Sequence, residues 1–237
     1  MSRKSRKPLL ISAGVALATV TLGLVSWQAT APQERQDDTS ASAGSTPRTD
    51  PAAELKALAR REAGDKLALG RADAPVVLIE YSDFKCGYCG KFARDTEPEL
   101  VKKYVEDGTL RIEWRNFPIF GAESEAAAKA AWAAGQQDRF GAFHAAAYAE
   151  DAKAKGFGEE RLTELARQAG VPDLERFKRD MAGEQAAAAL RKDQEEGYRI
   201  GVQSTPSFLV NGQPLAGAQP LAAFDAAVAR AKAAAQR

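Results

Sequence analysis

The sequence is poor in sulfur and imidazole side chains. Its 237 residues include only two cysteines, two methionines and one histidine. A structural zinc site usually needs four Cys or His ligands, so this set argues against one. Charge is nearly balanced, with a formal net of +1. The first 31 residues carry four Lys or Arg and no acid, so the remainder has 29 basic and 32 acidic residues, a net of −3. This balance gives no indication of nucleic-acid binding.

Both cysteines lie in one short motif, Cys86-Gly-Tyr-Cys89. The motif follows the apolar run Val76–Tyr81 and precedes a helical pattern. We therefore expect a strand, a turn and a helix, with the first sulfur at the helix N-terminus. Free amide groups and the positive end of the helix dipole favour a thiolate there. A pair placed in this way can open and close by thiol–disulfide exchange.

Two other uses of the cysteines fit the sequence less well. A purely structural disulfide fits the spacing, but so small a loop would constrain the unfolded chain only modestly. A Cys–His nucleophile would require His144 to reach Cys86. Because Phe140, Phe143 and Tyr148 surround His144 in the sequence, a packed histidine at the core or its boundary is favoured over a catalytic one. The redox interpretation is therefore preferred.

The N-terminus has the pattern of an export segment over residues 1–31. A basic start is followed by Leu9 to Trp27 without a charge, and Ala29-Thr-Ala31 resembles a small-residue cleavage site. Pro32 disfavours cleavage there, and the apolar stretch is long enough to span a bilayer. A cleaved signal peptide and an uncleaved signal anchor both fit, and either would export the rest of the chain. Export places the cysteines where disulfides persist.

Residues 32–65 are predicted to be a disordered linker, because they are rich in Gln, Asp, Thr, Ser, Ala and Pro. Asp50 and Pro51 suit the start of a short helix that would run to about Glu62. The folded domain is expected over residues 66–237, which is long enough for one domain with a real core.

The order of predicted elements is strand, helix and strand, then helices, then a hairpin and a last helix. The apolar run at Val76–Tyr81 and the alternating run at Leu110–Phe117 flank a helix kinked near Thr96, which favours a parallel pair of strands. Helices are expected at about 123–137, 139–152, 159–169 and 173–199. Asn211-Gly212 predicts a two-residue hairpin, and the final helix spans Pro220 to Lys232.

Three segments in this order resemble the DsbA-like thiol–disulfide oxidoreductases. They are Gly70–Cys89, then Phe140–His144 with Tyr148, and Ser204–Gly212. The resemblance covers about residues 67 to 235. It implies an α/β thioredoxin fold with an inserted helical domain at about residues 121–200.

The resemblance also implies roles for five residues. Cys86 would be the nucleophile and Cys89 the buried resolving thiol. Glu80 would be a proton acceptor or shuttle near Cys89; the alternative is a strand-end acid that reaches solvent. Pro206 would be a cis-proline facing the cysteines, with the Thr205 backbone free to pair with a substrate chain. An ordinary trans-proline that opens an edge strand is the alternative.

The residues that would tune the redox pair depart from the best-known strongly oxidising members, which have Pro-His between the cysteines. Gly87 lacks the rigidity of proline, and Tyr88 cannot supply an imidazolium. Lys85 and Lys91 would either replace part of that positive field or be solvated surface charges. This departure leaves the direction of electron flow open.

The expected function is the introduction of disulfides into exported proteins. No cofactor is expected beyond the Cys86–Cys89 disulfide. The family implies a membrane reoxidase of the DsbB or vitamin-K-epoxide-reductase-like kind, and substrates that are exported proteins with cysteine pairs. The expected location is the extracytoplasmic face of the bacterial cell membrane, or the periplasm or medium after cleavage. Two alternatives stay open: a reductase or isomerase of the same fold, and a tethered chaperone-like binding module with a static disulfide.

Overall fold

A computed structural model describes residues 51–150 and 152–236. The predicted export segment, residues 1–31, and residues 32–50 of the predicted linker lie outside this part of the chain. Within the described residues, no helix has the length and apolar character needed to cross a membrane.

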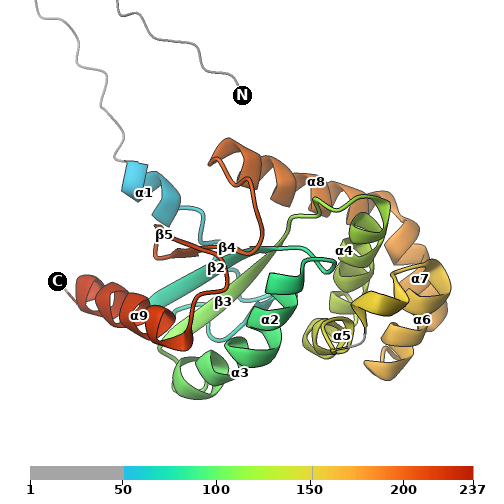
Figure 1. Cartoon of the computed structure of the whole chain (residues 1–237), viewed down its shortest axis with the longest axis horizontal. Coiled ribbons are helices and arrows are strands. Elements are labelled where there is room, and N and C mark those ends of the chain that lie inside the picture. The colour runs from blue at the N-terminus through green and yellow to red at the C-terminus, as the bar shows by residue number, and fades with distance from the viewer. Residues whose placement is uncertain (1–50, 151, 237) are drawn as a thin grey trace, which may run out of the picture. The chain divides into compact units, whose positions relative to one another are not determined.

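A five-stranded sheet forms the centre of the fold, in the order β1-β3-β2-β4-β5 (Figure 1). The strands are β1 (Ala68–Leu69), β2 (Val76–Ser82), β3 (Leu110–Asn116), β4 (Ser207–Val210) and β5 (Gln213–Ala216). β2 pairs in parallel with β3, as predicted, and antiparallel with β4. All seven residues of β2 are buried, because helices cover both faces of a central strand and its near-continuous apolar sequence suits that position.

One face of the sheet is covered by the helices that follow β2 and by the last helix. These are α2 (Gly87–Asp95), α3 (Glu97–Leu100) with a π-helical turn at Val101–Val105, and α9 (Leu221–Ala235). Phe92, Leu100 and Phe224 of these helices pack on Val76 and Leu78 of β2. The break at Thr96 was predicted: Pro98 has no N–H for the helix that precedes it, so a new helix starts at Glu97.

The helical insertion lies between β3 and β4, and Figure 1 shows its helices gathered beyond one end of the sheet. It consists of α4 (Ala122–Gly135), α5 (Phe140–Ala147), a 3₁₀ turn (Lys153–Lys155), α6 (Glu159–Gln168), α7 (Leu174–Ala182) and α8 (Glu184–Arg199). The prediction of a single helix over 173–199 is wrong. Gly183 adopts an extended conformation, φ −79° and ψ 160°, which ends α7 and starts α8.

The β4–β5 hairpin turns at Asn211 and Gly212, as predicted. Both residues have positive φ, 46° and 83°, which a type I′ turn requires. A side chain at Gly212 would also meet the backbone of Lys56 in α1 (Pro51–Lys56) at 2.6 Å. The turn therefore needs glycine both for its conformation and for the close approach of α1.

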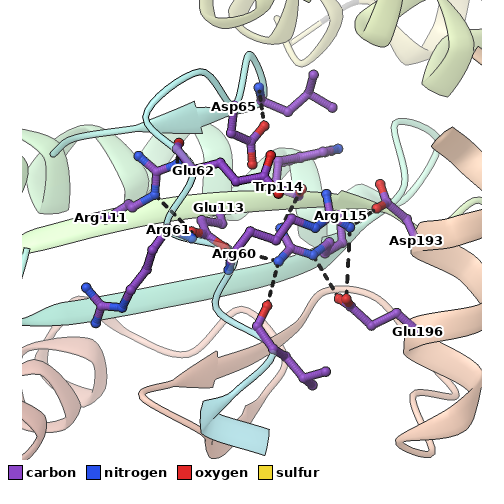
Figure 2. Close-up of polar contacts among 12 residues, drawn as sticks. Arg60, Arg61, Glu62, Asp65, Arg111, Glu113, Trp114, Arg115, Asp193 and Glu196 are labelled. Carbon is purple, nitrogen blue, oxygen red and sulfur yellow. Dashed lines mark hydrogen bonds and ion pairs between the residues drawn. The ribbon is translucent and has the colours of Figure 1, made fainter. Parts of the chain in front are cut away.

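The charged residues of β3 are buried in an ionic network, which Figure 2 shows in close-up. Glu113 is 0% exposed and its carboxylate accepts four hydrogen bonds. The backbone N–H groups of Arg60 and Arg61 donate over 3.0 and 2.8 Å. The side chains of Arg111 and Arg115 donate over 2.9 and 3.0 Å. These donors satisfy a buried anion that would otherwise be very costly.

The same network joins the insertion to the segment after α1. From α8, Glu196 accepts a hydrogen bond from Arg115 at 2.8 Å, and Asp193 pairs with Arg60. Arg115 also donates to the Leu58 carbonyl at 3.0 Å. The helix predicted to run to about Glu62 ends at Lys56 instead, because residues after it extend across the sheet to form these bonds. Residues 58–62, placed by the sequence at the end of a linker, thus contact the domain directly.

Candidate active site

The two cysteines lie where β2 gives way to α2, on a turn organised by Asp83. The Asp83 carboxylate accepts a hydrogen bond from the Lys85 backbone N–H at 2.7 Å, and its carbonyl accepts one from that of Cys86 at 3.0 Å. Its second carboxylate oxygen accepts from the backbone N–H of Ile119 at 2.6 Å. Asp83, which had no predicted role, therefore positions the cysteine turn against the loop that follows β3.

Cys86 is the N-cap residue of α2 and Cys89 lies within its first turn. Both are free thiols in the structure, with exposed fractions of 6% for Cys86 and 0% for Cys89. A hydrogen bond from the Cys89 thiol lowers the pKa of Cys86 to about 5, and contacts with Thr205 and the first N–H groups of α2 add to this effect. Burial raises the pKa of Cys89, and the neighbouring Cys86 raises it further. The two sulfurs therefore differ strongly in their affinity for a proton.

The loop before β4 closes the site from the other side. The Thr205–Pro206 peptide bond is cis. The Cys86 thiol donates a hydrogen bond to the Thr205 carbonyl oxygen at 3.2 Å. The Thr205 hydroxyl is buried without a hydrogen-bond partner among the described residues. Thr205 and Pro206, predicted from a distant part of the sequence, thus lie directly at the first cysteine.

Glu80 lies in the middle of the sheet, 0% exposed. Its neighbours across the sheet are Trp114 of β3 and Phe208 of β4. Neither carboxylate oxygen has a hydrogen-bond partner among the described residues. Burial raises the pKa of Glu80 well above its usual value, and the nearby Glu97 and Cys86 raise it further. Since the side chain is fully buried, the alternative of an acid that reaches solvent does not fit.

The residues expected to tune the pair lie at the surface. Tyr88 is 69% exposed, and Gly87 beside it is also exposed. Lys85 pairs with Glu123 at 2.6 Å and Lys91 pairs with Asp95 at 2.6 Å. An acid therefore balances each lysine, which weakens the positive field that they were considered to supply.

His144 packs in the core behind the cysteines. Its ring is 4.6 Å from that of Trp114 and 4.9 Å from that of Tyr148, centroid to centroid. Burial lowers its pKa to about 3, so the imidazole is neutral. The ionisable group that it faces is Glu97, with 3.6 Å between Nδ1 and Oε2. A Cys–His nucleophile would need this ring at Cys86, and the structure turns it to Glu97 instead.

Sequence reasoning missed two further members of this buried group. Glu97 was read only as part of the helix break before Pro98, although it is 8% exposed. The Tyr148 hydroxyl lies 3.3 Å from that of Ser82, at the end of β2. Among the described residues, no three His, Cys, Asp or Glu side chains are arranged to hold a metal ion.

Comparison with known proteins agrees with this geometry. The sequence profile of a family described as Thioredoxin matches residues 62–230. A probable disulfide bond formation protein D from Bacillus anthracis is 32% identical over 151 residues, which are 61% of this chain and 69% of that protein.

Two solved structures are also similar. BdbD from Bacillus subtilis, in its oxidised form, matches with a TM-score of 0.66 and 24% identity over 70% of this chain and 92% of that one. A thioredoxin-like oxidoreductase from Silicibacter pomeroyi matches with a TM-score of 0.63 and 30% identity over 71% of this chain and 97% of that one. The fold, the family profile and the relatives agree that this chain belongs to the thioredoxin superfamily as a DsbA-like thiol–disulfide oxidoreductase.

Proposed function

We propose that this protein introduces disulfide bonds into exported proteins and that Cys86 and Cys89 carry the reaction. The observation that supports this direction most is the contrast between the two sulfurs. A thiolate at Cys86 is stabilised by the Cys89 thiol and by the start of α2. Stabilising that thiolate stabilises the reduced form of the pair, which makes the disulfide form the stronger oxidant.

In the proposed reaction, a substrate thiolate attacks the Cys86 sulfur of the protein disulfide. A new S–S bond joins the substrate to Cys86, and Cys89 leaves as a thiolate that takes up a proton. The substrate's second thiol loses its proton and attacks the substrate sulfur of this mixed disulfide, so Cys86 leaves as a thiolate. Two electrons have then passed from the substrate dithiol to the protein, and the substrate holds a disulfide.

Glu80 is proposed as the proton donor to Cys89. Burial raises the pKa of both groups, and the Ser82 hydroxyl, which acts on both, offsets part of that rise. Because burial keeps Glu80 protonated well above the usual range, it holds a proton that the departing Cys89 thiolate can take. In the reverse direction the carboxylate of Glu80 accepts that proton back.

Thr205 and Pro206 are proposed to hold the substrate chain. A proline at position 206 has no N–H to direct at the sulfurs. The Thr205 carbonyl oxygen, 3.2 Å from the Cys86 sulfur, would then accept a hydrogen bond from the backbone of an extended substrate. Tyr88, Ile119 and Phe120 are exposed large hydrophobic residues. Tyr88 lies between the two cysteines, and the backbone N–H groups of Ile119 and Phe120 donate to Asp83 of the cysteine turn. These three side chains would contact substrate side chains.

The partners and location are proposed on the resemblance to the family. Substrates are exported proteins with cysteine pairs, and a quinone-linked membrane reoxidase of the DsbB or vitamin-K-epoxide-reductase-like kind takes the electrons from the reduced pair. The protein would act on the extracytoplasmic side of a bacterial membrane, anchored or released by residues 1–31. Mass spectrometry of the mature N-terminus distinguishes these two cases.

The reduction potential of the pair tests the direction of the reaction. The protein is equilibrated in glutathione buffers of increasing reducing strength, quenched with an alkylating reagent, and the Cys86–Cys89 state is read by mass. An oxidase should give a potential more positive than about −200 mV, since oxidases and isomerases lie at about −120 to −180 mV and thioredoxin at about −270 mV. A value near that of thioredoxin would support the reductase instead. Cys86→Ala separates both from a binding module, whose activity would survive the change.

A further inference from the structure

A second buried acid, Glu97, lies behind the cysteine pair and has no part in the reaction as described so far. It is the first residue of α3, directly after the break at Thr96. Its side chain is 11% exposed, whereas Glu80 is fully buried. Glu97 therefore lies closer to solvent than the acid proposed to serve Cys89.

Glu80 and Glu97 border the same group of buried side chains. Alternation along β2 directs Glu80 to the same face as Leu78, which α2 and α3 cover. Trp114 lies beside Glu80 across the sheet, and the His144 ring is 4.6 Å from that of Trp114. His144 Nδ1 in turn lies 3.6 Å from Glu97 Oε2, which is too long for a good hydrogen bond.

This buried group is short of polar partners. Both oxygens of Glu80 and Nε2 of His144 have none among the described residues. The titratable groups that face it are Cys86 and Cys89 from α2, Asp83 from the turn before α2, His144 from α5 and Tyr148 directly after α5. Two acids that share a low-dielectric site resist ionising together, so they bind and release protons as a pair.

The pKa values of Glu80 and Glu97 are both shifted in the direction that keeps the two acids protonated at neutral pH. Burial raises the pKa of Glu97 to about 8. Burial also raises the pKa of Glu80, and the second cause is the charge of Glu97. The imidazole of His144 is neutral, since burial lowers its pKa to about 3, so it does not neutralise either carboxylate.

We propose that Glu97 is a positioning residue of the redox reaction: it exchanges a proton with Glu80 and connects that acid to solvent. The inference rests on the proposed function. When Cys89 leaves as a thiolate, its sulfur takes the proton of Glu80. The Glu80 carboxylate then takes the proton of Glu97, and Glu97 regains one from water. When the pair is oxidised again, the proton leaves Cys89 along the same groups in the opposite order.

The test compares E97Q with E99Q, a matched substitution at an exposed residue of the same short helix. The rate of exchange with a reduced dicysteine peptide is followed across the pH range, alone and in an E80Q background. General acid–base groups contribute about 10²–10⁴-fold to a rate, and because Glu97 acts through Glu80 we expect E97Q to lose about tenfold at neutral pH. E99Q should match the wild type. E97Q should cost nothing further once Glu80 is Gln.

Infrared titration of the carboxyl bands supplies a readout that a merely structural role would not move. Removing the charge of Glu97 should lower the pH at which the Glu80 carboxyl band disappears. Glu97→Asp, which keeps the acid on a shorter side chain, should recover part of the lost rate, and it carries the test if E97Q fails to fold. Equal rates and equal Glu80 titrations in E97Q and E99Q would overturn the inference, as would full additivity of E80Q and E97Q.

Failure of the proposed function has a different signature. A wild-type protein that exchanges no disulfide with the peptide contradicts that function. The infrared titration would still show whether Glu97 shifts the titration of Glu80. A wild type that exchanges normally, with E97Q indistinguishable from E99Q, contradicts only the inference about Glu97.

Discussion

Replacing Glu80 should stabilise the fold while it slows the chemistry. Both carboxylate oxygens are buried without a hydrogen-bond partner among the residues that the structure describes, and an unsatisfied buried polar group costs about 1–3 kcal/mol. Glu80→Leu removes that cost with a side chain of similar size that suits the neighbouring Trp114 and Phe208. We therefore expect E80L to raise the free energy of unfolding by about 1–3 kcal/mol under acidic conditions, where the acid is neutral in both states.

The gain in the free energy of unfolding of E80L over the wild type should grow with pH. The pKa of Glu80 is raised in the folded protein, so the folded state keeps a proton that the unfolded state has lost. Its contribution is fully present below the unfolded pKa, at about 4.3, and is lost as pH rises toward the folded pKa. In this window the stability of the wild type should fall relative to E80L by about 1.4 kcal/mol per pH unit.

Urea unfolding of the reduced protein, followed by tryptophan fluorescence between about pH 5 and pH 6, measures this difference. Glu80→Gln is the matched control, because it removes the titration and keeps a buried polar group. The free energy of unfolding of E80Q should lack the pH dependence that Glu80 causes, and it should rise less than that of E80L. The reasoning is refuted if E80L is no more stable than the wild type and the difference does not change with pH.

Three further outcomes follow from other parts of the structure. Iodoacetamide should alkylate Cys86 with a midpoint near pH 5, and Cys89→Ala should raise that midpoint, because the Cys89 thiol is the largest cause of the low pKa. Arg115→Met should cost about 3–5 kcal/mol in urea unfolding, because it removes one of the two buried arginines paired with Glu113 and the close partner of Glu196; an unchanged midpoint would contradict the role given to the network. Gly197→Ala should lower thermal stability by about 1–3 kcal/mol, since its Cβ would meet the Phe117 ring at 2.6 Å; a neutral result would mean that the ring moves freely.

The sequence was a good guide wherever local chemistry decides the structure. The CxxC turn, the break at Thr96 and the Asn211-Gly212 hairpin each depend on residues adjacent in the chain, and each appears in the structure. The fold class followed from the order of these local features together with the family resemblance. Glu80 could be placed on the central strand because the apolar run around it is continuous.

The sequence was a poor guide where charged residues find partners far away. Arg111, Glu113 and Arg115 alternate with apolar residues, a pattern typical of a strand with one solvated face, yet all three are buried. Some of their partners are distant in the chain: Arg60 lies 53 positions from Glu113, and Glu196 lies 81 positions from Arg115. Glu97 was overlooked for the same reason, since nothing next to it in the chain indicates the rings that cover it.

Because of the ionic network on β3, the two faces of the sheet respond differently to a change in pH. It groups three arginines, Arg60, Arg111 and Arg115, with three acids, Glu113, Asp193 and Glu196, so its formal charge is zero. The opposite face holds two acids beside a neutral imidazole. A rise in pH through about 8 adds charge behind the cysteines and leaves the network's balance unchanged. The sheet thus separates two groups of ionisable residues. Titration changes the charge on the face that lies behind the cysteines, while the network on the other face, which anchors the insertion, keeps its balance of charge.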